Sequence, residues 1–345
     1  MQAVRNVDRR LSYIFLCTNL EGNRGMKKFI FFALLGSVTV AVAGREQGAK
    51  QGYEKRTFVY KTAGPDSIRS DYYRPANDTS IHPVIVWIHG GALMWGSRNS
   101  LPADQLEFYL AAGYAVFSMD YRLAPETKLA EIVEDVQDAL IWVQKNGGQL
   151  RIDPRRIFVV GHSAGAYLAL VSGYTLRIPP RAIVSFYGYG DIESAWCNRP
   201  DSVYLRSGVV PGEKALSAVH RFAITNASSK ERSDLYVYCR QQGSWASTVC
   251  GSDPARDTAA YDRYCPLKNI RSTFPPVLLV HGDRDTDVPF EQSVLLEEAL
   301  ARNSVEHQFI RMSGMGHAFD RMNGGLSNTE IMNAFSAVAK FLDGH

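Results

Sequence analysis

The pentapeptide Gly161-His162-Ser163-Ala164-Gly165 constrains the fold of this chain more than any other segment. It joins an apolar run over residues 157–160, which predicts a buried strand, to a segment over residues 166–170 that predicts a helix. A sharp strand-to-helix turn exposes the residue at its apex, and glycines on both sides let the two elements approach closely. A serine hydroxyl becomes a useful nucleophile when such a turn places it beside a base. The pattern therefore predicts an α/β architecture with Ser163 as a candidate nucleophile.

Apolar runs alternate with helical patterns along most of the remaining chain. Runs that are apolar on both faces of a strand cover residues 83–88, 114–119, 182–187 and 276–280. Weaker strand patterns lie at residues 57–61, 67–73 and 307–312, and helices are expected over residues 106–112, 132–143, 295–301 and 331–342. This alternation predicts a mostly parallel central sheet with helices on both faces. Ligands of such sheets bind beyond the carboxyl ends of the strands.

Length and composition favour one large domain. The chain has 345 residues, of which 46% are hydrophobic, so we expect a sizeable core over residues 55–345. Residues of about 190–272 interrupt the alternation and are rich in Tyr, Trp, Ser, Arg and Cys, which predicts an inserted lid. The net charge of +3, without a long basic block, gives no reason to expect nucleic-acid binding. Oligomeric state cannot be predicted from these features.

The N-terminal region has the pattern of a secretory signal peptide. A basic start at Met26 is followed by an apolar run over residues 29–40 and by Ala41-Val42-Ala43, so residues 26–43 are expected to be removed after Ala43. The run is shorter than the ~20 residues of a membrane span, although an uncleaved anchor is the alternative. Residues 1–25 carry charges unlike those of a signal peptide, and we expect translation to begin at Met26. Residues 44–54 are then a linker, and the mature protein is expected to be periplasmic or secreted, without a stable membrane span.

Four cysteines fall within the predicted lid, namely Cys197, Cys239, Cys250 and Cys265. An oxidising compartment would allow up to two disulfides in three pairings, and free, partly buried thiols are the alternative. No Cys-x-x-Cys spacing suggests zinc, so we expect neither a metal nor another cofactor.

A base for Ser163 is expected in the glycine-rich loop after the last strand. His317 lies there, in the segment 314–319, and a histidine in such a loop can turn its ring toward the serine. His162 is adjacent to Ser163 in sequence, but the tight turn should direct it away, so we expect it to pack at the turn. His281 is expected to be structural, and His89 to order a neighbouring loop.

Three carboxylates are candidates for orienting the base: Asp283, Asp285 and Asp287 follow the strand that ends at Gly282. Any of them satisfies the chain order Ser, Asp, His. Spacing from Gly282 and from Val288 favours Asp285, with Asp287 as the main rival. The selected carboxylate would fix the tautomer of the histidine and stabilise its protonated form.

Donors for a developing oxyanion are expected at two places. One is the backbone N–H of Ala164, directly after the candidate nucleophile. The others lie after the strand at residues 83–88, where Gly90, Gly91 and Ala92 can turn backbone N–H groups toward a substrate, with Gly91 and Ala92 favoured. Side chains that could line a pocket here, with ordinary core packing as the alternative, are Met94, Trp95, Tyr187, Tyr189 and Trp196.

Together these segments resemble the α/β-hydrolase fold, and within it the carboxylesterases similar to hormone-sensitive lipase and to the BD-FAE-type bacterial esterases. The residues that carry the resemblance are His89-Gly90-Gly91-Ala92, residues 120–126, residues 161–165, residues 281–289 and Gly316-His317. The resemblance covers residues of about 55–343 apart from most of the lid. It implies hydrolysis of short-acyl esters, either small-molecule or linked to polysaccharide, through an acyl-serine on Ser163 and without a cofactor.

Two departures refine this resemblance. The loop reads His-Gly-Gly-Ala where relatives have His-Gly-Gly-Gly, which weakens the expectation of activity on esters of bulky tertiary alcohols. The insertion falls between late strands, which favours the BD-FAE-like or the prolyl-oligopeptidase-like branch. Two other functions are weighed against the esterase. A serine peptidase of the prolyl-oligopeptidase type normally carries a large β-propeller, and a non-catalytic binding protein of this fold usually lacks a triad member.

Overall fold

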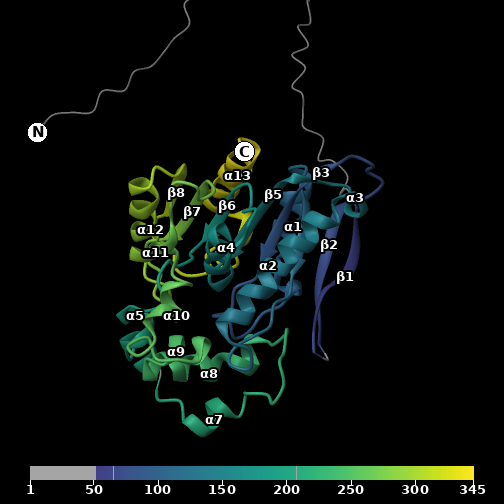
Figure 1. Cartoon of the computed structure of the whole chain (residues 1–345). Helices are drawn as coiled ribbons and strands as arrows, with labels where there is room; N and C mark the ends of the chain where they lie inside the picture. Colours follow the sequence, from purple (N-terminus) through teal and green to yellow (C-terminus); the bar gives the residue numbers. More distant parts are fainter. Residues whose placement is uncertain (1–51, 65, 207) are drawn as a thin grey trace, which may run out of the picture. The chain divides into compact units, whose positions relative to one another are not determined.

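An eight-stranded sheet forms the centre of the protein in the computed structural model, which describes residues 52–64, 66–206 and 208–345 (Figure 1). The expectations for a start at Met26, a signal peptide over residues 26–43 and most of the linker lie outside these residues. The strands are β1 (Tyr53–Ala63), β2 (Asp66–Pro75), β3 (His82–Ile88), β4 (Ala115–Met119), β5 (Ile152–His162), β6 (Ile183–Phe186), β7 (Val277–Gly282) and β8 (His307–Met312).

The strand order is β1-β2-β4-β3-β5-β6-β7-β8. Strands β3 to β8 pair in parallel, whereas β1 pairs with β2, and β2 with β4, in antiparallel fashion. The mostly parallel sheet predicted from the sequence is therefore confirmed. Its parallel strands all present their carboxyl ends at one edge, where the glycine-rich segments follow β3, β5 and β8 and the three aspartates follow β7.

Alternation within each buried strand divides the core into two layers. On β3, Val84, Val86 and Ile88 face one layer, whereas Ile85 and Trp87 face the other. All five side chains are fully buried because both faces of the sheet are covered. This double burial is why the central strands read as continuous apolar runs.

Helices cover both faces of the sheet. The first layer contains side chains of α2 (Leu129–Lys145), α4 (Ala164–Thr175) and α12 (Glu291–Arg302), and the second those of α1 (Ala103–Ala111) and α13 (Thr329–Asp343). Single turns complete this part of the chain as η1 (Arg98–Ser100), α3 (Gly147–Leu150) and η2 (Gly325–Ser327). Among the residues described, no helix has both the length and the apolar character that a membrane crossing requires.

The segment between β6 and β7 forms a cluster of short helices at one end of the sheet, drawn in green in Figure 1. These are α5 (Ala195–Asn198), α6 (Ser202–Leu205), α7 (Gly212–Leu216), α8 (Ser229–Gln242), α9 (Trp245–Cys250), α10 (Thr258–Asp262) and α11 (Pro266–Asn269). The longest, α8, begins at a capping box of Ser228 and Glu231 and ends at Gly243 in the left-handed conformation. Trp245 and Val249 join the first core layer, so this lid packs continuously onto the core of the sheet.

The structure corrects the expectation of disulfides, because all four lid cysteines are free thiols. Three have local acceptors: Cys197 lies 3.5 Å from the carbonyl of Ser194, Cys239 lies 3.6 Å from the Thr248 hydroxyl, and Cys265 lies 3.2 Å from the carbonyl of Gly190. Burial raises the pKa of each thiol, in Cys250 and Cys265 to about 12. A high pKa suppresses the thiolate that disulfide formation needs.

Candidate active site

Ser163 occupies a strained turn between β5 and α4. Its backbone has φ 54° and ψ −120°, a conformation that costs a non-glycine residue roughly 1–3 kcal/mol, and its N–H donates to the carbonyl of Phe186 at 2.9 Å. A Cβ on Gly161 would lie 2.2 Å from the carbonyl oxygen of Gly165, and one on Gly165 would lie 2.2 Å from that of Ile88. Both flanking glycines are therefore required for β3, β5 and α4 to meet beneath the serine.

His317 and Asp285 complete a chain of hydrogen bonds that begins at this serine. The Nε2 atom of His317 lies 3.0 Å from the Ser163 Oγ, and its Nδ1 lies 2.7 Å from Oδ2 of Asp285. An ionised carboxylate only accepts, so Nδ1 carries the proton and donates it to Asp285. The Nε2 lone pair then faces the Ser163 hydroxyl and can accept its proton.

The Asp285 side chain is fully buried and is held by four donors. Its Oδ1 accepts the N–H groups of Asp287 and Val288, at 2.8 and 2.9 Å. Its Oδ2 accepts from His317 and also lies 3.1 Å from Nε2 of His281. Burial alone would raise the pKa of Asp285, but the hydrogen bonds from His281 and His317 hold it well below its usual range. Asp285 is thus ionised and fixed, and Asp283 points elsewhere, pairing with Arg311 at 2.8 Å.

Two histidines that sequence patterns associate with the site play other parts. The ring of His162 stacks on Phe186, with centroids 4.5 Å apart, so its imidazole packs beneath the turn. The ring of His89 stacks on Tyr121, and burial lowers the pKa of His89 to about 4. A neutral His89 donates from Nδ1 to the carbonyl of Gly90 at 2.8 Å, which orders the loop after β3.

The loop after β3 carries the candidate oxyanion donors. The carbonyl of Gly91 accepts the N–H groups of Met94 and Trp95, at 2.8 and 3.0 Å, which turns the loop back on itself. Gly91 has φ 109° and Ala92 φ 53°, and within the described residues neither N–H donates to a backbone carbonyl. The N–H of Ala164 lies at the first residue of α4, where no intrahelical acceptor exists. These three N–H groups are thus available at the carboxyl edge of the sheet.

The lid fixes this loop through a contact that the sequence did not indicate. The indole N–H of Trp245, in α9, donates to the carbonyl of Ala92 at 3.1 Å, and the N–H of Gly96 donates to the carbonyl of Ala227 at 2.8 Å. Trp245 is 3% exposed. The hydrogen bond from this buried indole to the Ala92 carbonyl restrains the peptide next to the candidate donors. The composition of the lid gave no signal for this pairing.

A cavity of about 190 Å³ opens above Ser163. Its lining includes Trp95 and Tyr187, as expected, and the Tyr187 ring packs 4.7 Å from that of His317. The expectation is not met for Met94 and Tyr189, which are buried in the first core layer and are not among the lining residues. The lining consists of Gly90, Gly91, Ala92, Trp95, Gly96, Ser100, His162, Ser163, Tyr187, Asp287, His317, Ala318 and Arg321.

Comparison with known proteins identifies the family. The BD-FAE family model matches residues 70–300, which is 231 of the 345 residues. This chain belongs to the BD-FAE family. The match includes Ser163, the loop after β3 and Asp285, and the expected resemblance to BD-FAE-type α/β hydrolases is confirmed.

Relatives of this BD-FAE protein include much longer proteins. The chain is 28% identical over 305 residues to the non-reducing polyketide synthase Preu6 of Preussia isomera, an alignment that covers 79% of this chain and 14% of the synthase. The chain therefore spans only a small part of that relative.

Solved structures share the fold along nearly their whole length. An α/β hydrolase superfamily protein from Enterococcus faecalis is 23% identical, with a TM-score of 0.66 over 85% of this chain and 99% of that chain. A thermophilic esterase from Thermogutta terrifontis is 21% identical, with a TM-score of 0.61 over 84% of this chain and 91% of that chain. The BD-FAE protein described here thus has the α/β-hydrolase fold.

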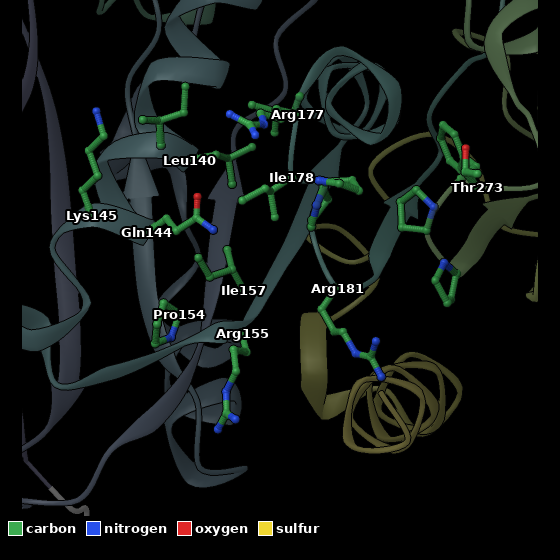
Figure 2. A pocket seen from close by; sticks show the side chains of 17 residues that line it. Leu140, Gln144, Lys145, Pro154, Arg155, Ile157, Arg177, Ile178, Arg181 and Thr273 are labelled. Carbon is green, nitrogen blue, oxygen red and sulfur yellow. The ribbon is translucent and has the colours of Figure 1, made fainter.

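A larger cavity of about 940 Å³ lies between α2, the start of β5 and the segments around Arg177 and Thr273 (Figure 2). Figure 2 shows Gln144, Ile157 and Ile178 turned toward its centre. Its described lining contains four basic side chains but no Ser, Cys, His, Asp or Glu. It therefore lacks a nucleophile with a base, and the smaller cavity at Ser163 is the candidate active site of this BD-FAE protein.

One cluster in the lid has the composition of a cation site. Ligand atoms of Asp191, Glu193 and Cys265 lie within 4.8 Å of one another. However, Asp191 already accepts two backbone N–H groups, and Lys268 forms an ion pair with Glu193. These contacts already engage both carboxylates, and the cluster takes no part in the chemistry below.

Proposed function

We propose that this protein is a serine carboxylesterase whose triad is Ser163, His317 and Asp285. The observation that carries the proposal is the continuous relay from the Ser163 hydroxyl through His317 to the buried carboxylate of Asp285, with distances of 3.0 and 2.7 Å. The relay meets three N–H groups and a cavity at the same edge of the sheet. Acyl transfer needs this set of groups: a nucleophile, a base held in one tautomer, and donors for an oxyanion.

The reaction follows from the positions of these groups. Nε2 of His317 takes the proton of Ser163 as Oγ attacks the ester carbonyl carbon. The N–H groups of Gly91, Ala92 and Ala164 stabilise the oxyanion, each contributing about 3 kcal/mol. His317 then protonates the leaving alcohol, leaving an acyl group on Ser163. Water, deprotonated by His317, releases the acid and restores the serine.

The size of the cavity supports a preference for short acyl groups. Its volume of about 190 Å³ lies below the roughly 300–1,000 Å³ of pockets that hold drug-sized ligands. Trp95 and Tyr187 line it with large, partly or fully buried rings. A long acyl chain would have to leave this cavity or displace those rings.

Hydrolysis of nitrophenyl esters tests the proposal. We expect kcat/KM for the octanoate to be at least about tenfold lower than for the acetate and the butyrate. An acyl chain that does not fit must displace the ring of Trp95 or Tyr187, and a tenfold loss corresponds to only about 1.4 kcal/mol. Release of nitrophenol by purified protein measures the rates. An octanoate preference would contradict the assignment of the cavity, and no hydrolysis of any ester by folded protein would contradict the esterase itself.

The pH dependence of the reaction follows from the environment of His317. Burial alone would lower the pKa of His317, but the charge of Asp287 and the hydrogen bond to Asp285 raise it above its ordinary value of about 6.5. Only neutral His317 can act as base, so kcat/KM should be lost as the pH falls through this raised pKa. Initial rates between about pH 5 and about pH 9 should give a midpoint above about 6.5. A midpoint well below that value would contradict the proposed role of the two carboxylates.

We further propose that the enzyme acts in the periplasm or outside the cell. Support comes from the sequence of residues 26–43 alone, with its basic start, apolar run and Ala-x-Ala site. N-terminal sequencing of the exported protein should begin at Gly44. A product that retains Met1 or Met26 would contradict this.

A further inference from the structure

One carboxylate of the active-site lining takes no part in the proton transfers of the proposed mechanism. Asp287 lines the cavity above Ser163, and its Oδ2 lies 3.5 Å from Nε2 of His317. It is not the orienting carboxylate, because Asp285 occupies Nδ1 of the same ring. Asp287 thus faces the side of His317 from which a proton passes to the leaving alcohol.

The lid holds Asp287 by its other oxygen. Oδ1 accepts the hydroxyls of Tyr204, at 2.6 Å, and Tyr236, and lies 3.2 Å from Nη1 of Arg240. Within the described residues, no side-chain or backbone donor forms a hydrogen bond with Oδ2. Asp287 therefore presents a fixed carboxylate oxygen to the cavity, and it remains 26% exposed there.

Arg240 does not cancel the negative charge of this carboxylate. Its guanidinium lies 2.5 Å from Asp201 as well as 3.2 Å from Asp287, so the three charged groups sum to −1. Arg240 is 2% exposed and packs against the rings of Trp196, Tyr204 and Tyr236, at 5.3, 4.9 and 5.7 Å. It is thus a support behind Asp287 and is shielded from the cavity.

The other charged side chain of the lining is Arg321. Its guanidinium lies 5.8 Å from the ring of Trp87, on β3, and its charge acts on His162, Asp320 and Tyr187. Asp287 is held by the lid and lies 3.5 Å from Nε2 of His317, so the charge in contact with the base is the negative one.

We infer that Asp287 is a specificity-determining residue that selects esters by the charge of their alcohol part, favouring a cationic alcohol over a neutral or anionic one. In the proposed mechanism the leaving oxygen must approach Nε2 of His317, which places the alcohol part next to Oδ2 of Asp287. A positive group there gains Coulomb attraction in a partly buried site, and an anionic group is repelled. The aromatic rings of Trp95 and Tyr187 in the same lining can also face a cation. This inference rests on the proposed esterase function.

The test compares three acetate esters on the full-length enzyme: acetylcholine, the neutral isostere dimethylbutyl acetate in which carbon replaces the ammonium nitrogen, and acetylglycolate, which is anionic. Release of acetic acid gives kcat/KM for each. We expect acetylcholine to exceed its isostere by about five- to tenfold, and acetylglycolate to fall below it by a similar factor. In Asp287→Asn both ratios should approach one, because the amide keeps an acceptor for Tyr204, Tyr236 and Arg240 but loses the charge.

Asp283→Asn is the matched control. It removes one carboxylate from the same loop, outside the cavity lining, where Asp283 pairs with Arg311. Damage to the lid in Asp287→Asn would lower all three rates together, so the ratios separate charge selection from structural loss. Unchanged ratios in Asp287→Asn, or equal changes in Asp283→Asn, would overturn the inference.

Failure of the inference can be told apart from failure of the esterase proposal. If nitrophenyl acetate is hydrolysed while the two ratios in the wild-type enzyme are close to one, or the three acetate esters are not hydrolysed, only the role of Asp287 is overturned. If no ester at all is hydrolysed faster by the wild-type enzyme than by Ser163→Ala, the esterase proposal itself fails.

Discussion

Replacement of Ser163 by alanine is expected to lower kcat for nitrophenyl acetate by about a million-fold. The change removes the atom that forms the acyl bond while keeping the Cβ that the strained turn already accommodates. The oxyanion donors are backbone groups and remain in place, so a small residual acceleration should persist. Steady-state rates and a thermal melt of the same sample measure both effects, and the melting temperature should change little.

Ser172→Ala is the control for this change, because it removes a hydroxyl from α4, the helix that directly follows Ser163. The Ser172 hydroxyl donates to the carbonyl of Ala169 at 2.7 Å, within α4 and away from the cavity lining. Its activity should stay close to that of the wild type. If Ser163→Ala kept more than a few per cent of the activity, Ser163 would not be the nucleophile.

Replacement of Asp285 by asparagine is expected to lower kcat by about 10⁴-fold. The N–H groups of Asp287 and Val288 need an acceptor at Oδ1, so the amide oxygen should take that position. The amide nitrogen then faces His317 Nδ1 and donates to it, which places the ring proton on Nε2. In that tautomer His317 cannot accept the Ser163 proton. Rates with nitrophenyl acetate measure the loss.

Asp283→Asn serves as the comparison on the same loop. Its carboxylate is outside the cavity lining, where it binds Arg311 and the N–H of Gly314, so activity should be nearly unchanged. If Asp285→Asn stayed active while Asp287→Asn became inactive, Asp287 would be the orienting carboxylate instead.

Much of the fold follows from local patterns in the sequence. Strands such as β3 are apolar on both faces because both core layers press on them, and this double burial is visible as an unbroken run from Val84 to Ile88. The turn at Ser163 is also encoded locally, since Gly161 and Gly165 are the positions where a Cβ would collide with backbone. Patterns of this kind reflect contacts between residues that are close in sequence, or contacts that any regular covered sheet makes.

The choice among the three aspartates depends on a geometry that spacing alone does not contain. Asp285 is selected because its Oδ1 caps the N–H groups two and three residues later, which points Oδ2 at His317. The same turn places Oδ2 of Asp287 3.5 Å from Nε2 of His317. His281 also reaches Asp285, a contact made only when β7 and the following turn are folded.

Contacts between the lid and the hydrolase core could not be predicted from the sequence, for a different reason. Trp245 and Ala92 are separated by 153 positions in the sequence, and Arg240 and Asp287 by 47. No periodic pattern in the sequence predicts either contact. Which side chains line the cavity also depends on the backbone conformation of the loop after β3. Ala92 and Leu93 both have positive φ, and after this bend Met94 is buried while Trp95 faces the cavity. Neighbours in sequence can thus have opposite environments where the chain leaves regular structure.

Labelling with a fluorophosphonate tests the central claim most directly. The reagent bonds to a serine only when a base and oxyanion donors activate it, so peptide mass spectrometry should find one adduct, on Ser163. The adduct should be absent from Ser163→Ala and greatly slowed in Asp285→Asn. Absence of labelling in folded wild-type protein, or an adduct on another serine, would contradict the proposed active site.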